Sequence, residues 1–123
     1  MKKEFVPYEQ ALELKELGFD EPCFATWVGE TLDMSLQHKS DGYFTQAPTF
    51  SQVFRWFRYN FWFYIEIQPF SFIQNIECSS FSCVVWHLKA QYNIGIYKTY
   101  EEAELACLKK LIELAKKNNY GKI

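Results

Sequence analysis

The sequence predicts an α+β fold: a single domain over residues 1–123 in the order α-ββ-α-βββ(β)-α, with an antiparallel sheet and helices packed mainly on one face. Three amphipathic segments repeat their apolar residues at helical spacing. From Phe61 the apolar period changes from 3.6 residues to 2, as it does where a chain enters a sheet. A chain of 123 residues that is 49% hydrophobic and 23% charged suits one globular core.

The first helix is predicted over residues 7–17. Pro7 opens it, because proline is favoured at the first helical position. Gly18 follows as a left-handed C-terminal residue, which places Phe19 against Leu14 in the apolar contact of a Schellman ending. The helix is therefore expected to stop at a defined point.

A hairpin is predicted over residues 23–36, around the two-residue turn Gly29-Glu30. Apolar and polar residues alternate in its second half, so one face of the hairpin is expected to be buried. Residues 37–47 are polar and contain glycine, which predicts an exposed loop.

The second helix is predicted over residues 48–59, with Thr49 as a cap and Gln52 three residues on. Its apolar stripe consists of Phe50, Val53, Phe54 and Phe57. Its opposite side consists of Ser51, Gln52, Arg55, Arg58 and Tyr59. Trp56 lies at the edge of the stripe, where a side chain is expected to pack partly and stay partly exposed.

Strands are predicted over residues 61–67, 70–76 and 81–88, with a short fourth strand over 92–97 as an option. The last helix is predicted over residues 100–118. It begins with the capping box Thr99 to Glu102, carries glutamates in its first turn and lysines in its last, and has a broad apolar side.

Charge argues against a surface that holds a nucleic-acid duplex. The formal net charge of −2 divides into −4 over residues 1–40, from four Lys and eight acids, and +1 over each of 41–99 and 100–123. Duplex-binding proteins usually carry a basic stripe, because phosphate neutralisation drives their binding. No segment of this chain is strongly basic.

The segment before Pro7 lacks the apolar core and cleavage site of a signal peptide, and the apolar runs are too short to span a bilayer. A cytoplasmic location and no membrane contact are therefore expected. The four cysteines are then expected to be reduced thiols, mostly in the core.

The sequence predicts no metal, no cofactor and no catalytic site. Cys78, Cys83 and His87 have zinc-like residue types, but four residues of strand put Cys83 and His87 about 13 Å apart at roughly 3.3 Å each. His38 lies in the polar loop, and His87 lies in an aromatic strand, so neither is placed as a general base. Motifs of nucleotide-binding and hydrolytic enzymes are missing.

A surplus of aromatic residues is the functional signal of the sequence. Twelve Phe, eight Tyr and four Trp make up 20% of the chain. In the strand after Phe61, Trp62 and Tyr64 point away from the Phe and Ile side, so both faces need cover. Either another element covers them, or they form a binding platform. The predicted surface consists of Trp56, Tyr59, Trp62 and Tyr64, with Arg55 and Arg58 at its rim.

Three segments, residues 9–23, 47–58 and 99–111, resemble a family of small proteins of unassigned activity from gut Bacteroidetes and their phages or prophages. The resemblance covers about a third of the chain. It implies a mobile-element setting and names no activity.

The α-β-β-β-α order after residue 47 is similar to that of double-stranded RNA-binding domains. Tyr100, Glu101 and Glu104 stand where the lysine clamp of that family would be, and glutamates there repel phosphates. Residues 61–67 also lack the basic residue and glycine of the RNA-recognition-motif strand. The sequence hypothesis is a non-enzymatic accessory protein that binds a protein partner or itself, with single-stranded nucleic acid or RNA on the same face as the alternative.

Overall fold

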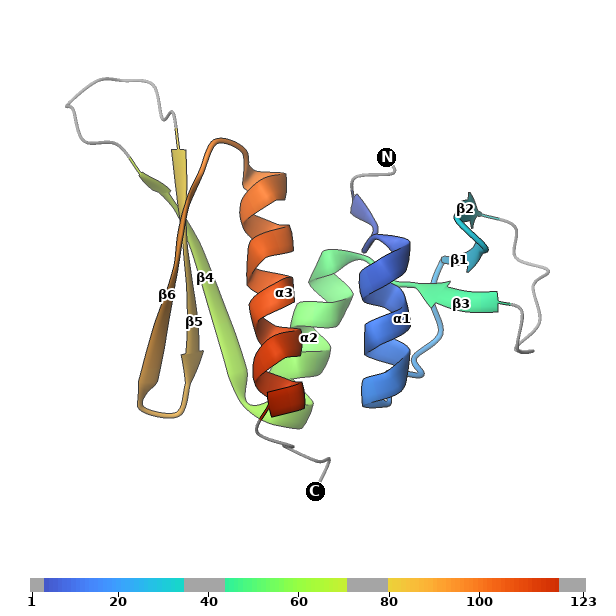
Figure 1. Ribbon diagram of the computed structural model, residues 1–123, viewed down its shortest axis with the longest axis horizontal. Helices are drawn as coiled ribbons and strands as arrows, with labels where there is room; N and C mark the ends of the chain where they lie inside the picture. Colours follow the sequence, from blue (N-terminus) through green and yellow to red (C-terminus); the bar gives the residue numbers. More distant parts are fainter. Residues whose placement is uncertain (1–3, 35–43, 71–79, 118–123) are drawn as a thin grey trace. The chain divides into compact units, whose positions relative to one another are not determined.

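The computed structural model describes residues 4–34, 44–70 and 80–117. The chain divides into two compact units, residues 1–53 and 54–123, each described below by itself. The elements of the described residues are α1 (Tyr8–Leu17), β1 (Ala25–Val28), β2 (Thr31–Asp33), β3 (Phe44–Ala47), α2 (Phe50–Phe61), β4 (Phe63–Phe70), β5 (Ser80–His87), β6 (Ala90–Tyr97) and α3 (Tyr100–Lys117) (Figure 1). The α+β class and the antiparallel pairing are confirmed. The strands form two sheets of three, where one sheet was expected.

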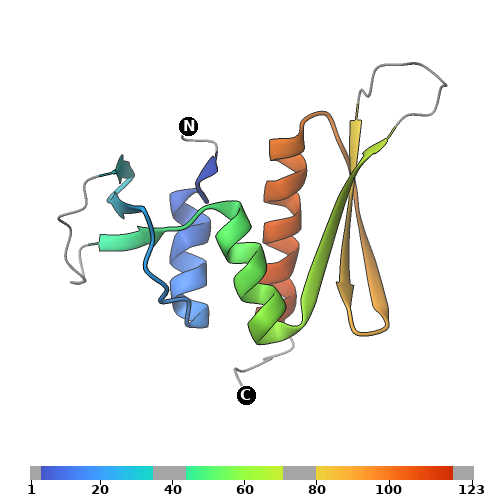
Figure 2. The ribbon, with the colours of Figure 1, turned by 180° about the vertical axis from the view of Figure 1, so that it is seen from behind.

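The first unit combines α1 with the antiparallel sheet β2-β1-β3 (Figure 2). Trp27 on β1 is buried, and its Nε1 donates a hydrogen bond of 3.0 Å to the carbonyl oxygen of Val6. The Tyr8 ring meets Trp27 edge-on, with 6.0 Å between the centroids. The backbone N–H of Val6 donates to the carbonyl of Pro48 at 2.8 Å, which ties the start of the chain to the segment after β3.

The predicted ending of α1 is confirmed. Gly18 has φ of 103° and its N–H donates to the carbonyl of Lys15 at 3.1 Å. The N–H of Phe19 donates to the carbonyl of Leu14 at 2.9 Å, and both side chains are buried. These are the hydrogen bonds of a Schellman ending.

The predicted turn of the hairpin is also confirmed, with Gly29 at φ +61° between β1 and β2. The loop predicted over 37–47 is wrong at its end, because Phe44–Ala47 forms β3. β1 is the central strand of its sheet, and its second edge needs a partner for its backbone groups. β3 supplies that partner, and the small side chains of Ala25 and Ala47 face each other across the pair. His38 lies outside the described residues.

Helix α2 begins after Thr49, whose Oγ1 accepts a hydrogen bond of 3.2 Å from the N–H of Gln52 as predicted. The helix was expected to stop at residue 59, but it continues to Phe61 and ends at Trp62, which has φ of +63°. Asn60 supports this last turn by donating from Nδ2 to the carbonyl of Trp56 at 2.9 Å.

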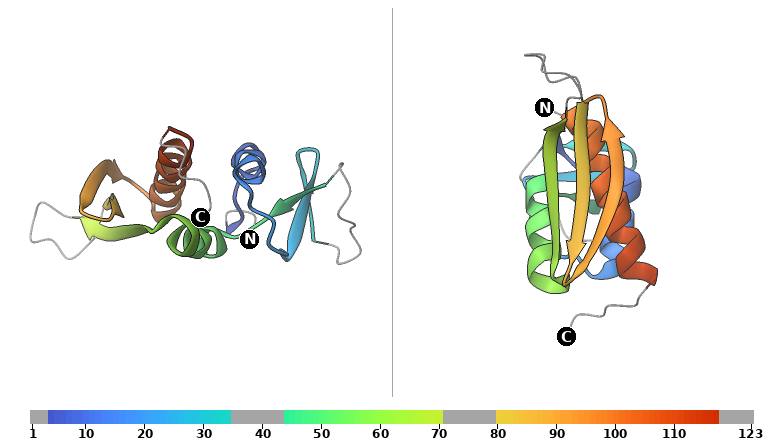
Figure 3. Two further views of the ribbon diagram at one scale, coloured as in Figure 1. Left: turned by 90° about the horizontal axis from the view of Figure 1, so that it is seen from below. Right: turned by 90° about the vertical axis from the view of Figure 1, so that its left-hand side faces the viewer.

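The second unit contains the antiparallel sheet β4-β5-β6, with α3 across one face (Figure 3). The first strand begins at Phe63 rather than residue 61, because Phe61 still belongs to α2. It runs on through Pro69, which an edge strand tolerates because one side of its backbone lacks a partner. The strand predicted over 70–76 lies outside the described residues beyond Phe70. The optional fourth strand is present as β6.

The core of the second unit lies between the sheet and α3. Phe57, Phe61 and Phe63 form a run of aromatic contacts. The rings of Phe61 and Phe63 are stacked, with 5.8 Å between their centroids and 3° between their planes.

The capping box of α3 is confirmed: the N–H of Thr99 donates to Glu102 Oε1 at 3.1 Å, and the N–H of Glu102 donates to Thr99 Oγ1 at 3.0 Å.

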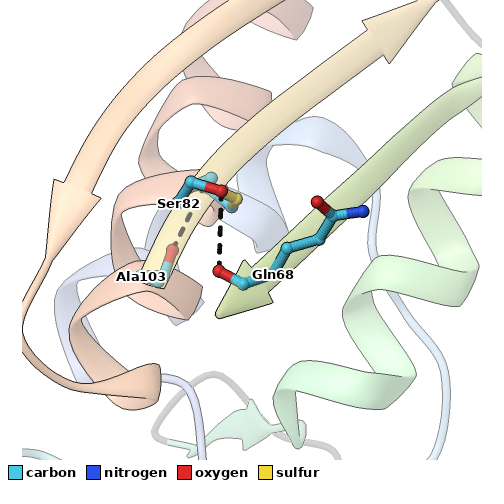
Figure 4. The surroundings of a disulfide bond; sticks show 5 residues. Gln68, Ser82 and Ala103 are labelled. Atoms are coloured by element: carbon cyan, nitrogen blue, oxygen red, sulfur yellow. Dashed lines mark hydrogen bonds between the residues drawn. A yellow bond between two sulfur atoms is a disulfide. The ribbon is translucent and has the colours of Figure 1, made fainter. Parts of the chain in front are cut away.

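A disulfide joins Cys83 on β5 to Cys107 on α3, which corrects the expectation of reduced thiols. Both residues are fully buried at the packed faces of strand and helix, with 6.5 Å between their Cα atoms, a separation at which a disulfide forms. Figure 4 shows its surroundings: the Ser82 hydroxyl donates to the carbonyl of Gln68 at 3.5 Å, and the Ala103 carbonyl oxygen lies 3.5 Å from the Cys83 sulfur.

Candidate interaction surface

The face of the second sheet opposite α3 carries exposed aromatic residues. Strand alternation sends Phe63 and Val85 toward α3, where they are buried, and turns their neighbours outward. Tyr64 on β4 lies directly opposite Trp86 on β5 in the register. The right-hand view of Figure 3 looks onto this outer face, with α3 behind the strands.

Two further large side chains extend this aromatic pair at one end of the sheet. Trp62 immediately precedes Phe63, and Leu88 immediately follows His87, and Phe63 and His87 are register partners. We call the four residues at this end the hairpin-end patch. They are Trp62 (58% exposed), Tyr64 (45%), Trp86 (37%) and Leu88 (74%).

The local sequence explains why Trp62 faces outward. Phe61 ends α2 and Phe63 begins β4, and both are buried and stacked on each other. The single residue between them must reverse the chain, and Trp62 does so with φ of +63°. This left-handed conformation costs a residue with a β-carbon about 1–2 kcal/mol. The arrangement of two buried phenylalanines thus holds a tryptophan in solvent.

Leu88 is exposed for a similar reason. It is the first residue of the two-residue turn Leu88-Lys89 that joins β5 to β6, and its φ is +56°. Hairpin turns of this length need a positive φ at that position and usually take glycine, asparagine or aspartate there. An exposed leucine therefore stands at a position whose backbone geometry does not favour it.

Polar side chains on the outer face are engaged with one another. Trp86 Nε1 donates to Glu66 Oε1 at 3.4 Å, and Gln68 Nε2 donates to Glu66 Oε2 at 2.7 Å. Gln91 Nε2 donates to Asn93 Oδ1 at 3.0 Å on β6. Glu66 is the one carboxylate among the outward-facing side chains that the structure describes on these strands. The face is therefore close to neutral and mostly apolar at the hairpin end.

The structure separates the residues of the predicted surface. Trp56 is only 3% exposed and packs edge-on against Phe57 and Phe61, at 5.0 and 5.3 Å, so its expected place on the surface is wrong. Trp56 is buried in addition to the predicted stripe of Phe50, Val53, Phe54 and Phe57, so the buried face of α2 is wider than predicted. Trp62 and Tyr64 are exposed together on the hairpin-end patch.

The remaining predicted residues lie on α2. Tyr59 is 74% exposed, and the Arg58 guanidinium carbon lies 5.8 Å from the centroid of its ring. Arg55 is exposed, whereas Arg58 is half-buried. A binding role for Arg55, Arg58 and Tyr59 stays a prediction. Sequence reasoning missed Leu88, which it placed at the end of the strand predicted over residues 81–88.

The ionisable groups weighed for chemistry are engaged in packing. The His87 ring packs edge-on against Phe63 at 4.8 Å, and burial lowers the pKa of His87. Burial, and then the charge of Glu21, raises the pKa of Cys23 to about 12, so its thiol is protonated at neutral pH. Within residues 4–34, 44–70 and 80–117, no three His, Cys, Asp or Glu side chains cluster to hold a metal ion.

The start of α3 is acidic, with Glu101 and Glu102 in its first turn and Glu104 next to them. Burial, and then the charge of Glu101, raises the pKa of Glu104 to about 7. Burial and the charge of Glu104 raise the pKa of Tyr100. An anionic ligand such as a phosphate would meet negative charge at this helix end.

The raised pKa of Glu104 predicts a pH dependence of stability. The folded protein keeps a proton that the unfolded chain releases at its ordinary pKa of 4.5, so stability falls as pH rises from about 4.5 through about 7. We expect urea titrations across this range to show the fall in wild type and a flatter profile in Glu104→Gln. Glu113→Gln, at an exposed glutamate of the same helix, is the control. Identical profiles for wild type and Glu104→Gln would contradict the prediction.

Comparison with protein-family models, curated proteins and solved structures gave no match. The resemblances noted in the sequence therefore stay predictions. In the part of the chain that the structure describes, no helix combines the length and apolar character needed to cross a membrane.

Proposed function

We propose that this protein is a non-enzymatic accessory protein that binds a protein partner through the hairpin-end patch. The observation that carries the proposal is the exposure of the cross-strand pair Tyr64 and Trp86, flanked by Trp62 and Leu88 at positive φ. Strained backbone conformations persist only where the surrounding structure holds them in place, and they are found most often at functional sites. Trp and Tyr are also the residue types most enriched at the centres of protein interfaces.

The size of the patch suits a protein interface. Aromatic side chains bury about 150–250 Å² each, so the exposed fractions of Trp62, Tyr64 and Trp86 leave roughly 300 Å² of mainly apolar surface, to which Leu88 adds more. A standard interface buries about 800 Å² on each partner, a little over half of it apolar. The patch therefore supplies about the apolar share of one side of such an interface.

Charge favours a protein over a nucleic acid as the ligand. The outer face carries the carboxylate of Glu66, which accepts a hydrogen bond from the indole of Trp86. This negative charge therefore lies beside the aromatic rings on which a nucleic-acid base would stack. A phosphate backbone that followed this face would be repelled there. Stacking of single-stranded nucleic acid on Trp62 and Tyr64 remains the alternative, with Arg55, Arg58 and Lys89 as its cations.

The proposal includes a mobile-element origin, which the resemblance of residues 9–23, 47–58 and 99–111 to phage-associated proteins supports, and a cytoplasmic location. Such a location requires the Cys83–Cys107 disulfide to persist against cellular thiols. Complete burial of both residues favours its persistence, because exchange needs direct attack by a thiolate on sulfur.

The double variant Trp62→Ser with Tyr64→Ser tests the proposal. Trp62 is 58% exposed and Tyr64 45%, so we expect cooperative unfolding near the wild-type urea midpoint together with loss of partner binding. Tagged wild type and variant are compared in pull-downs from a bacterial lysate with and without nuclease. One stoichiometric protein that survives nuclease and is lost with the variant is the expected result.

The control is Phe24→Ser, which removes a still more exposed aromatic residue, 72% in solvent, from the first unit. It should leave binding unchanged. A large fall in stability of the double variant would show that Trp62 and Tyr64 belong to the core. Binding that is steeply weakened by salt and removed by nuclease would replace the protein partner with a nucleic acid.

A further inference from the structure

Strand β6 forms an edge of its sheet and lacks two features that usually block strand pairing, a charged side chain and a proline. Its residues Ala90–Tyr97 include no charged side chain and no proline. Within the described residues β6 pairs with β5 alone, so one side of its backbone is open. The opposite edge, β4, carries Glu66 and Pro69. Charges and prolines on edge strands prevent pairing with other chains, and only β4 has them.

The register identifies which backbone groups of β6 are open. His87 and Ala90 close the two-residue turn as a hydrogen-bonded pair. Hydrogen-bonded and non-hydrogen-bonded pairs alternate in an antiparallel ladder, so the N–H and C=O groups of Gln91 and Asn93 point away from β5. Both residues precede the bulge in the register at Cys83/Val84, so this stretch of the edge is regular.

The side chains of β6 leave apolar surface on both faces at this edge. Tyr92 and Ile94 face α3 but are only half-buried, and Ile96 on the outer face is exposed. The cation of Lys110 on α3 lies 5.5 Å from the centroid of the Tyr92 ring and is paired with Glu113 at 3.3 Å. A strand added here would therefore contact aliphatic and aromatic surface beside a compensated charge.

We propose that β6 pairs antiparallel with β6 of a second copy of this chain, across a two-fold axis. The product is a continuous sheet in the order β4-β5-β6-β6-β5-β4. The pairing is self-complementary: two neutral strands meet without like-charge repulsion, and Tyr92 and Ile94 of each copy cover those of the other. The proposal concerns the edge of the sheet and is independent of the function proposed for its outer face.

The variant Gln91→Lys tests this pairing, and Gln68→Lys is its matched control. Each glutamine is exposed on an edge strand, and each donates a hydrogen bond to the side chain two residues from it. Only Gln91 lies on β6, so only Gln91→Lys brings two lysines to the proposed interface. We expect sedimentation equilibrium to give twice 14.7 kDa for wild type and Gln68→Lys. Gln91→Lys should raise the dimer dissociation constant about tenfold or more.

Hydrogen exchange measures directly whether the outward-pointing amide groups of β6 are hydrogen-bonded in the dimer. In the dimer, the amide protons of Gln91 and Asn93 should be protected, and their protection should fall on dilution. A wild-type protein that is still monomeric at about 100 μM would overturn the proposal, because specific dimers have dissociation constants well below that concentration. So would a dimer that Gln91→Lys leaves intact, or one that dissociates in the Trp62→Ser and Tyr64→Ser variant instead, because the outer face would then be the interface.

Discussion

Breaking the Cys83–Cys107 disulfide is expected to lower the free energy of unfolding by about 3.5 kcal/mol, from the chain entropy of a loop with a sequence separation of 24. Domains of this size are stable by only about 5–15 kcal/mol, so the loss removes a large share of the total. The effect should concentrate in the second unit, because the bond joins β5 to α3 there.

Urea titrations with and without reductant measure this effect, together with the double variant Cys83→Ala and Cys107→Ala. Reductant should lower the midpoint of wild type and leave that of the double variant unchanged. Cys23→Ala, which removes a free and half-buried thiol, is the control and should respond to reductant as wild type does. Equal wild-type midpoints in both conditions would show that the bond contributes nothing to stability.

The second large effect is a contrast between two aromatic residues three positions apart on α2. Trp56→Ala should destabilise the protein by about 3–5 kcal/mol, because Trp56 is buried against Phe57 and Phe61. Tyr59→Ala should change stability by no more than about 0.5 kcal/mol, because most of that side chain already lies in solvent.

Thermal and urea unfolding of the two variants, side by side, measure the contrast. Tryptophan fluorescence loses a reporter in Trp56→Ala, so far-UV circular dichroism is the common probe for both. Similar small losses in the two variants would return Trp56 to the surface. Similar large losses would mean that Tyr59 contributes to a packed contact.

Local signals in the sequence predicted the end of α1 and the start of α3, but not the end of α2. Gly18 and Phe19 end α1 as expected, and Thr99 and Glu102 cap α3 as expected, because these motifs act through residues that are neighbours in the chain. β3 was missed because it is defined by its partner: the polar stretch before Pro48 becomes a strand only once β1 offers an open edge. Its own residues give a weak strand signal.

Exposure was predicted correctly for Trp62 and Tyr64 from strand alternation, and for Tyr59 from its place opposite the apolar stripe of α2. Alternation placed Trp62 and Tyr64 away from the core, and they are exposed. Helical periodicity does not decide whether a residue at the edge of an apolar stripe is buried, so Trp56 was expected on the surface although it is buried. Leu88 was missed because a positive φ at a leucine has no sequence signal, and the pairing of Cys83 with Cys107 depends on how α3 crosses the sheet.

The disulfide also changes the connectivity of the molecule. Residues 83–107 form a covalent ring that includes all of β6 and the first turns of α3. A protease that cuts one bond inside this ring leaves both fragments attached, so the product has the mass of the intact chain plus one water until reductant is added. Strand β6 therefore stays covalently attached to the rest of the chain after any single backbone cut between Cys83 and Cys107.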